Sequence, residues 1–289
     1  MRSEAPSRPA MITCALSGVV ASRAQCPAIP YTPEEYAAEA LRAYEAGAAA
    51  VHIHARTPDG APSFEVEDYR RIRDAIVAAC PVIINFSTGA LGVSVEKRLA
   101  YLQAVLPAVA ALNMGSMNYA KYSERRRDFV FDFVFANPIS EIRALLAGMV
   151  EAEIRPECEC FDLGHVGTLA PLIEMGALPP VFQVSLILGV VGGIPGTVAN
   201  LVHSVNQLPA EADWEVVALS TDQWRLLAGG AALGGNVRVG LEDNFYVEPG
   251  VMARSNGDLV EKAARMLRDI GRPLADVATC RARLGLVHP

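Results

Sequence analysis

Apolar residues along this chain fall into short dense runs separated by longer stretches with helical spacing. Between Thr32 and Gly47 they recur every three or four residues behind a Thr-Pro-Glu-Glu start, which is typical of a capped helix with proline at its first position. Gly47 stands where a helix C-cap glycine is expected, and a dense run, Ala49–His54, follows directly. This segment therefore predicts a helix, a tight turn and a strand.

The same alternation continues to the end of the chain. Eight dense runs predict strands, at Met11–Leu16, Ala49–His54, Val82–Phe86, Val109–Met114, Arg155–Phe161, Val181–Leu188, Trp214–Leu219 and Asn236–Leu241. Helical patterns lie between them, for example at Val66–Ala79, Val95–Leu106, Glu141–Glu153 and Asp222–Ala231, and Gly257–Leu284 predicts one or two covering helices. Strands separated by helices pair in parallel, and dense apolar strands are buried on both faces.

Eight such units in 289 residues favour a closed (β/α)8 TIM barrel. We expect it to form a single domain over residues 1–289, with an open doubly wound sheet as the alternative architecture. The apolar run Val130–Phe135 has no clear place in either arrangement.

Composition narrows the function classes. Hydrophobic residues make up 52% of the chain, enough for a large core, and a formal net charge of -7 argues against general affinity for nucleic acid or anionic membranes. No apolar run is long enough to span a bilayer, and the first ten residues lack the apolar centre of a secretory signal. The six scattered cysteines are typical of free thiols in a reducing cytosol. We therefore expect a soluble cytoplasmic protein.

Two histidines end the second predicted strand. Side chains alternate along a strand, so His52 and His54 share one face, with Cα atoms roughly 6.7 Å apart. In a barrel of this kind, catalytic groups gather at the carboxyl ends of the strands. A pair of imidazoles there predicts a metal site, whereas a single histidine would more often be a structural core residue.

Carboxylates follow the last predicted strand. Glu242 would complete a set of two histidines and one carboxylate, which suits catalytic zinc, although iron(II) oxygenases use the same ligand types. Asp243 could instead cap a helix. Because these two residues are adjacent, both can face one site only if the strand ends by Glu242 and the chain turns. Arg238, four residues earlier, would have to reach upward along the strand.

Small polar residues end the third and fourth predicted strands. Ser87, Thr88 and Gly89 could approach a substrate carboxylate or oxyanion, and they could equally cap the next helix. Asn113 and Ser116 form a second polar rim after the fourth strand.

Three further features allow a functional and a plain interpretation. Glu159 faces the same way as Glu157 near the rim, where it could act as an acid–base or polarising group or be solvated. The loop with Gly192 and Gly193 could bring backbone amides close to a phosphate, or be merely flexible. The three arginines at 125–127 favour a solvated loop over a clamp for coenzyme phosphates.

Taken in order, these segments resemble the β-keto acid cleavage enzymes, a family of zinc-dependent (β/α)8 proteins whose type member cleaves 3-keto-5-aminohexanoate. The resemblance covers nearly the whole chain. It rests on VHIHAR at 51–56, NFSTG at 85–89, LNMGSMNY at 112–119, the glycine loop after the sixth strand and RVGLEDN at 238–244. It implies a homo-oligomer, commonly a tetramer, in which a β-keto acid condenses with acetyl-CoA and a retro-Claisen step releases acetoacetate and a new acyl-CoA.

The resemblance also implies roles for individual residues. Zinc would be held by His52, His54 and Glu242, with Asp243 as the general base and Arg238 beside it. Ser87 and Glu159 match further catalytic positions, and Asn113 matches a substrate-side position. From their places at the strand ends, we also expect Thr88, Gly89 and Ser116 to bind the substrate and Gly192 and Gly193 to contact the coenzyme.

One position departs from the family member that acts on an amino-substituted substrate. That enzyme has an acidic residue after the first strand, where this chain has Val20. The departure implies a keto acid with a neutral or apolar side chain rather than a cationic one.

Two other functions remain open from the sequence. A metal-dependent hydrolase of the amidohydrolase type also carries two histidines on a strand, usually the first, joined by later ones. Here His165, His203 and His288 do not fall at later strand ends. A non-catalytic small-molecule-binding barrel would keep the fold alone, and the intact set of Asp243, Arg238 and Glu242 argues against it.

Overall fold

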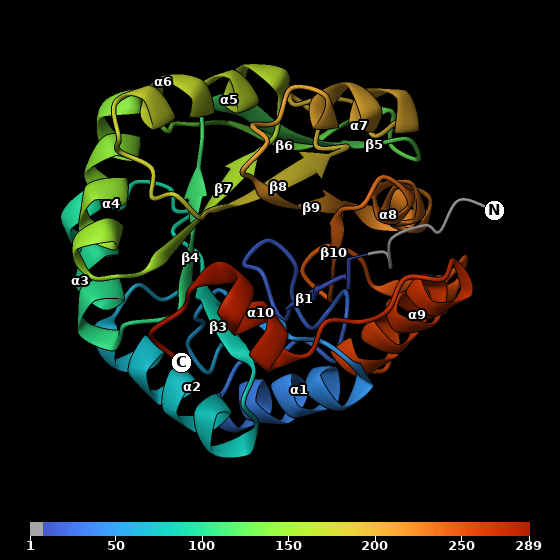
Figure 1. Ribbon diagram of the computed structural model, residues 1–289. Coiled ribbons are helices and arrows are strands. Elements are labelled where there is room, and N and C mark those ends of the chain that lie inside the picture. The colour runs from blue at the N-terminus through green and yellow to red at the C-terminus, as the bar shows by residue number, and fades with distance from the viewer. Residues whose placement is uncertain (1–7) are drawn as a thin grey trace.

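Eight parallel strands close into a barrel at the centre of the protein (Figure 1), in a computed structural model that describes residues 8–289. Around the barrel the neighbours run β1-β10-β9-β8-β7-β4-β3-β2. The strands are β1 (Ile12–Ala15), β2 (Ala50–Ile53), β3 (Ile83–Phe86), β4 (Val109–Asn113), β7 (Arg155–Cys160), β8 (Gln183–Leu188), β9 (Asp213–Ala218) and β10 (Asn236–Val239). The predicted closed (β/α)8 barrel is confirmed, and the open sheet is wrong.

Helices connect the strands and surround them (Figure 1). They are α1 (Pro33–Ala46), α2 (Val66–Ala79), α3 (Val95–Val105), α4 (Ile139–Glu151), α5 (Leu163–Gly167), α6 (Leu169–Glu174), α7 (Val198–Val205) and α8 (Gln223–Ala232), the last preceded by a 3-10 turn, Ser220–Asp222. The capping box of α1 is present, because the Thr32 side chain accepts from the Glu35 amide and the Glu35 carboxylate accepts from the Thr32 amide. Gly47 ends α1 with a φ of 117°.

The C-terminal segment forms two helices, α9 (Asn256–Asp269) and α10 (Val277–Leu284). Cys280 and Leu284 of α10 pack with Met11 and Ala49, which precede β1 and β2, so α10 covers the amino-terminal end of the barrel. An open hollow of about 940 Å³ beside α10 contains none of the candidate site residues. The six cysteines are buried free thiols.

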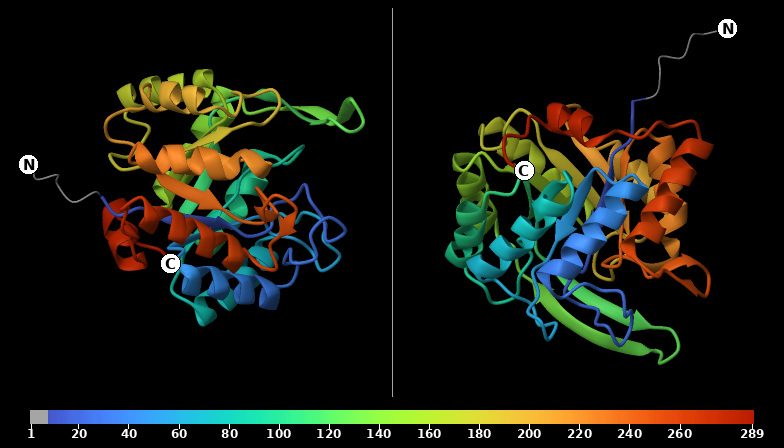
Figure 2. Two further views of the ribbon diagram at one scale, coloured as in Figure 1. Left: turned by 90° about the vertical axis from the view of Figure 1, so that its right-hand side faces the viewer. Right: turned by 90° about the horizontal axis from the view of Figure 1, so that it is seen from below.

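One hairpin stands away from the barrel (Figure 2). It consists of β5 (Met117–Ser123) and β6 (Asp128–Phe135), which pair antiparallel. The run Val130–Phe135, which the sequence left unplaced, is most of β6. We call residues 117–135 the arm. A second, short hairpin, β11 (Tyr246–Glu248) with β12 (Val251–Met252), follows the last barrel strand.

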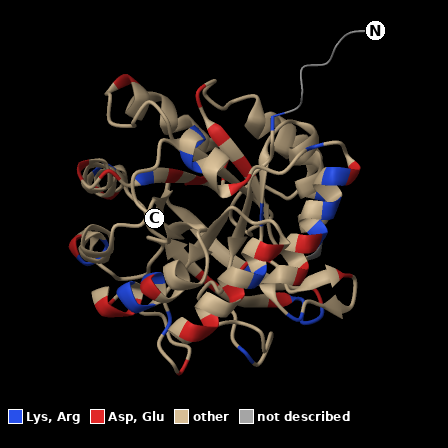
Figure 3. Ribbon diagram, turned by 60° about the horizontal axis from the view of Figure 1, so that its bottom comes forward, with Lys and Arg blue, Asp and Glu red and all other residues tan. Residues whose placement is uncertain are grey.

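Charged residues of both signs are interspersed over the outer helices and loops (Figure 3). Within residues 8–289, no helix combines the length and the apolar character needed to cross a bilayer.

Candidate active site

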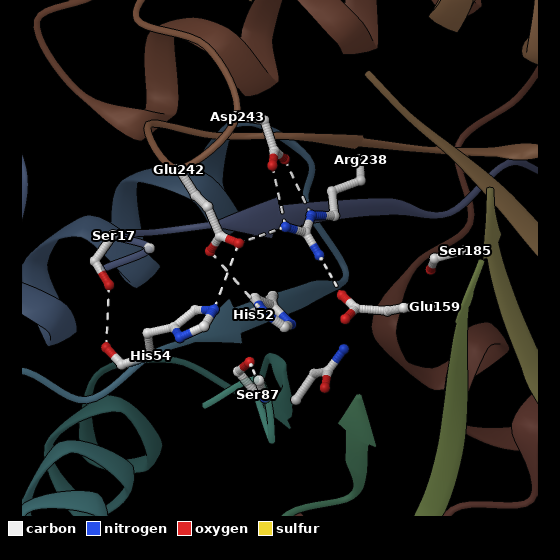
Figure 4. Close-up of polar contacts among 12 residues, drawn as sticks. Ser17, His52, His54, Ser87, Glu159, Ser185, Arg238, Glu242 and Asp243 are labelled. Carbon is white, nitrogen blue, oxygen red and sulfur yellow. Dashed lines mark hydrogen bonds and ion pairs between the residues drawn. The ribbon is translucent and has the colours of Figure 1, made fainter. Parts of the chain in front are cut away.

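Arg238 is the centre of the polar cluster at the carboxyl ends of the strands (Figure 4). Its side chain is 2% exposed and donates to three carboxylates. Nε and Nη2 donate to the two oxygens of Asp243 at 3.0 and 3.1 Å, Nη2 also donates to Glu242 at 2.7 Å, and Nη1 donates to Glu159 at 3.3 Å. One guanidinium thereby fixes the positions of three acids that come from two strands.

A turn brings the two adjacent carboxylates to the same side. β10 ends at Val239, and the amides of Asp243 and Asn244 both donate to the carbonyl of Gly240. Gly240 has a φ of 139°, in the region that favours glycine. The predicted strand end at Leu241 is therefore two residues too late. The geometric requirement recognised in the sequence, a strand end before Glu242, is met.

His52, His54 and Glu242 offer ligand atoms that all lie within 4.8 Å of one another. His54 Nε2 and His52 Nε2 lie 3.5 and 3.8 Å from the two oxygens of Glu242. Both ring nitrogens of His52 and one oxygen of Glu242 are buried without a hydrogen-bond partner. Buried polar atoms normally have partners, so a metal ion fits as the common partner of His52 Nε2 and the Glu242 oxygen, whereas His52 Nδ1 faces Glu157 on the other side of the ring.

The charge states of His52 and Glu242 suit metal binding. Burial, together with the nearby Arg238 charge, lowers the pKa of His52 well below its usual range, so the imidazole is neutral and has a free lone pair. Burial would raise the pKa of Glu242, but Arg238 and the two imidazoles outweigh it and hold that pKa well below the usual range. Neutral imidazole and ionised carboxylate are the forms that bind zinc.

The other two acids on Arg238 hold their protons more tightly. Burial raises the pKa of Asp243 to about 6, although Arg238 opposes the shift. Burial and the neighbouring Glu157 raise the pKa of Glu159 to about 8. Asp243 can therefore accept a proton near neutral pH, and Glu159 can donate a hydrogen bond from its acid form.

A deeper layer of polar residues, to which the sequence assigned no role, lies below the site. Glu157 accepts from Asn85 and from Ser185, and its Oε2 lies 4.0 Å from His52 Nδ1. Ser185 also contacts Glu215 at 3.0 Å, and Thr13 donates to Glu215 at 2.7 Å. These side chains are all buried. Alternation of side chains along a strand could have predicted two of them. Asn85 lies two residues before Ser87 and Glu157 two residues before Glu159, so each shares a face with a candidate site residue.

The predicted substrate-side residues divide into two groups. Ser87 lies beside the histidines (Figure 4), and Asn113 pairs in register with Glu159, so both border the cluster. Thr88 instead donates to the carbonyl of Ala111, and Ser116 accepts from the amide of Asn137. The hydroxyls of Thr88 and Ser116 thus have structural partners in this structure.

Gly192 and Gly193 lie against the arm and the chain after β7. A Cβ on Gly192 would stand 1.8 Å from the carbonyl oxygen of Asn118, and one on Gly193 would stand 2.5 Å from that of Phe161. Close backbone approach therefore requires both glycines. Their predicted contact with the coenzyme stays a prediction.

Arg56 organises the loop that follows β1. Its guanidinium donates to the carbonyls of Ser17, Gly18 and Ala21 at 3.2, 2.8 and 2.6 Å, and it is 4% exposed. Val20, on the same loop, is 60% exposed. Arg56 lies in the VHIHAR segment, and its role in holding this loop depends on tertiary contacts that the segment does not reveal.

The remaining histidines lie elsewhere. His165 is in α5 and accepts from the amide of Phe161, His203 is in α7, and His288 contacts the carbonyl of Ala152. Among the described residues, two groups could hold a metal, namely His52 with His54 and Glu242 and His52 with Glu157 and Glu159, and neither includes any of these three histidines. The cluster therefore lacks the additional histidines of the hydrolase alternative.

Comparison with known proteins identifies the relatives of this chain. A family model described as beta-keto acid cleavage enzyme matches residues 9–286. The 3-keto-5-aminohexanoate cleavage enzyme of Acetoanaerobium sticklandii is 37% identical over 280 residues, which is 96% of this chain and 98% of that protein.

Two further relatives are named as acetyl-CoA transferases. The 3,5-dioxohexanoate:acetyl-CoA acetone transferase of Paraburkholderia graminis is 33% identical, over 98% of this chain and 97% of that protein. The 3-oxoadipate:acetyl-CoA acetyltransferase of Cupriavidus necator is 31% identical, over 97% of this chain and 96% of that protein. A solved ternary complex of ObcA with a C4-CoA adduct and oxalate superimposes with a TM-score of 0.76 at 22% identity, over 90% of this chain and 68% of that chain, which shows the shared fold.

Proposed function

Because this chain belongs to the β-keto acid cleavage enzyme family, we propose that it catalyses a zinc-dependent reaction of a β-keto acid with acetyl-CoA, releasing acetoacetate and a new acyl-CoA. The observation that carries the proposal is the convergence of a two-histidine, one-carboxylate set with an Arg238-held Asp243. The names of the transferase relatives support acetyl-CoA as the co-substrate.

Zinc would be held by His52, His54 and Glu242, whose ligand atoms lie together and include unpartnered buried atoms of His52 and Glu242. When bound, the ion would supply positive charge that polarises the substrate's keto and carboxylate oxygens and lowers the pKa of the carbon between them.

Asp243 is the general base in this mechanism. It removes a proton from the carbon between the two carbonyl groups, and Arg238 fixes its orientation through two hydrogen bonds. The carbanion attacks the thioester carbonyl of acetyl-CoA, and the thiolate of coenzyme A leaves. The thiolate then attacks the original keto carbon, the carbon–carbon bond beside it breaks, and acetoacetate takes up a proton. Ser87 and Glu159 bind the substrate's oxygens.

The substrate we propose is a keto acid with a neutral or apolar side chain. By the resemblance, Val20 stands on the loop after β1 where the family member that acts on an amino-substituted substrate has an acidic residue. In addition, an apolar cluster that includes Met117, Phe161 and Val217, with Tyr119 and Phe135 packed against it, lies beside the polar site. This apolar cluster would stabilise an apolar substituent of the substrate and would leave a cationic substituent without a partner.

We also propose a cytoplasmic location and a homotetramer. An acidic chain with six free thiols and no helix in residues 8–289 suited to a bilayer is compatible with the first. Large apolar side chains on the surface, among them Val134 and Val77, support the second.

The proposal is tested by measuring metal content and assaying acetyl-CoA with β-keto acids of varied charge. About one zinc per chain, with acetoacetate formed from a neutral keto acid, is the expected result. Turnover of a cationic keto acid alone would keep the reaction and reject the side-chain assignment. Zinc without any CoA-dependent product would favour a hydrolase, and tight ligand binding without turnover would favour a binding protein.

A further inference from the structure

We propose that the arm binds the coenzyme A portion of the co-substrate, with pantetheine along its aromatic face and the phosphates at the arginines of its tip. The inference rests on the proposed function, because it requires an acyl-CoA co-substrate. It assigns a ligand to the arm, a large element of residues 8–289 that takes no part in closing the barrel.

The base of the arm borders the candidate active site. Phe135 lies against Gly89, where a Cβ would be 3.7 Å from its ring and 3.4 Å from the Ser87 hydroxyl. Tyr119 and Phe161 flank this ring, with centroids 6.1 and 6.5 Å from that of Phe135. A ligand that lies along the arm therefore ends beside the residues proposed to bind the keto acid.

Aromatic rings continue outward from this base on one face of the hairpin. Tyr119 and Phe133 are paired across the strands and stack at 5.3 Å with an interplanar angle of 6°. Phe131 follows, 5.9 Å from Phe133 and 6.3 Å from Tyr119. The three rings are only half-buried, and they give an uncovered apolar strip that suits a slender, uncharged chain such as pantetheine.

Basic residues gather beyond the rings. Lys121 lies on the same face as Phe131, and Arg125, Arg126 and Arg127 form the turn between β5 and β6. All four are exposed, and none forms an ion pair within residues 8–289. The sequence favoured a plain solvated loop here, but three consecutive unpaired arginines at the end of an apolar strip match the phosphates at the end of pantetheine.

Acidic residues are also present on the arm, namely Glu124, Asp128 and Asp132. Asp132 is paired with Ala120 and so lies on the opposite face from the rings. Asp128 accepts from the amide of Phe129. The tip therefore has a local cationic excess in a chain whose net charge is -7.

The length of the arm matches this ligand. β6 has eight residues, which at about 3.3 Å per residue span roughly 25 Å between the site and the tip. Extended pantetheine is shorter than this between its thiol and its first phosphate, so it covers the inner part of the arm with the rings, and the phosphates that follow it extend to the tip. The base is held in place because the Ala120 amide donates to the Val191 carbonyl and because Gly192 admits the backbone of Asn118.

The direct test measures binding of free coenzyme A to the metal-loaded protein by calorimetry. The test variant is Arg125→Ala/Arg126→Ala/Arg127→Ala. The control, Arg143→Ala/Arg265→Ala/Arg268→Ala, removes three exposed arginines from α4 and α9 and so makes the same change in net charge. We expect the dissociation constant to rise about tenfold in the tip variant and to change less than twofold in the control.

A kinetic test separates the two parts of the ligand. The tip variant should show a raised KM for acetyl-CoA, an unchanged KM for the keto acid, and an unchanged kcat/KM with acetyl-pantetheine, which lacks the phosphates. Phe133→Ala should lower kcat/KM with both thioesters, whereas Val134→Ala, on the opposite face and 66% exposed, should not.

The outcomes distinguish a failure of the arm assignment from a failure of the proposed acyl-CoA-dependent reaction. No binding of coenzyme A to the unaltered protein would overturn both. Normal binding by the unaltered protein and equal loss, or no loss, in the tip and control variants would overturn the arm assignment alone. A tip variant whose sedimentation changes while its affinity for coenzyme A does not would assign the arm to a contact between copies of the chain, and would likewise overturn the inference.

Discussion

Gly240 lies so close to Ala15 that a Cβ on the glycine would stand 2.1 Å from the alanine carbonyl oxygen. This contact between the last and first barrel strands occurs where the chain leaves β10 and turns. The turn is what lets Glu242 and Asp243 reach one arginine, so the close approach and the site geometry depend on each other.

We therefore expect Gly240→Ala to impair both folding and metal binding. The Cβ must displace backbone, so the free energy of unfolding should fall by at least about 2 kcal/mol, and the zinc content of the purified protein should fall with it. Urea denaturation and elemental analysis measure the two quantities. Gly250→Ala is the matched control, because Gly250 also has a positive φ, 79°, but nothing lies within 4 Å of its Cβ position. Equal effects of both variants would contradict the steric explanation.

Glu242→Gln should lose zinc while keeping the fold. The substitution retains an oxygen that can accept from Arg238 but removes the ligand charge, so zinc affinity should fall by more than about a hundredfold. Glu159→Gln serves as the control and should keep its metal. Chelation of the unaltered protein should abolish turnover, and added zinc should restore it. An unchanged metal content in Glu242→Gln would remove this residue from the ligand set.

Asp243→Asn should keep its metal and lose turnover. The amide can still accept one hydrogen bond from Arg238 but cannot take up the substrate proton, so kcat should fall by about 10²–10⁴-fold. Exchange of the proton between the carbonyl groups, followed in deuterated water by NMR, reports the same step without acetyl-CoA. Full activity in this variant would refute the assignment of the base.

Glu215 should make the stability of the protein depend on pH. Burial and the nearby Glu157 raise its pKa to about 8 from the ordinary 4.5, so the folded state holds a proton that the unfolded chain has released. The contribution of Glu215 to the free energy of unfolding is therefore fully present below pH 4.5. It is lost progressively as the pH rises to 8, at about 1.4 kcal/mol per pH unit.

Glu215→Gln removes that loss. Its free energy of unfolding relative to the unaltered protein should rise between pH 5 and pH 8, as followed by urea denaturation at both values. Glu211→Gln, at an exposed position, should show no such change. A difference between Glu215→Gln and the unaltered protein that does not vary with pH would contradict the buried-proton interpretation.

The sequence predicted the barrel because its signals are local. Dense strands, capped helices and a glycine such as Gly47 are legible in short windows. The arm was not predicted, because β6 has Phe on one face and Val between two Asp on the other, so that its run Val130–Phe135 resembles a barrel strand although it lies outside the barrel. Periodicity reports which residues share a face but not what covers that face.

The same limit applies at the site. Parity predicted that His52 and His54 share a face, and it required a turn before Asp243. It did not predict that Asn113 would neighbour Glu159, or that Ser185 would join Glu157 to Glu215, because those contacts depend on the register between strands far apart in the sequence. The partners of Thr88 and Ser116 likewise follow from tertiary packing.

The hydrogen bonds from Arg56 to the loop after β1 have an evolutionary consequence. Every hydrogen bond from Arg56 goes to a main-chain carbonyl, at Ser17, Gly18, Ala21 and Gly60. The path of the loop is therefore set independently of the side chains it displays. On the substrate assignment proposed above, a substitution at Val20 would change the side chain offered to a substrate without remodelling the loop, so selectivity could diverge by single replacements on an unchanged barrel.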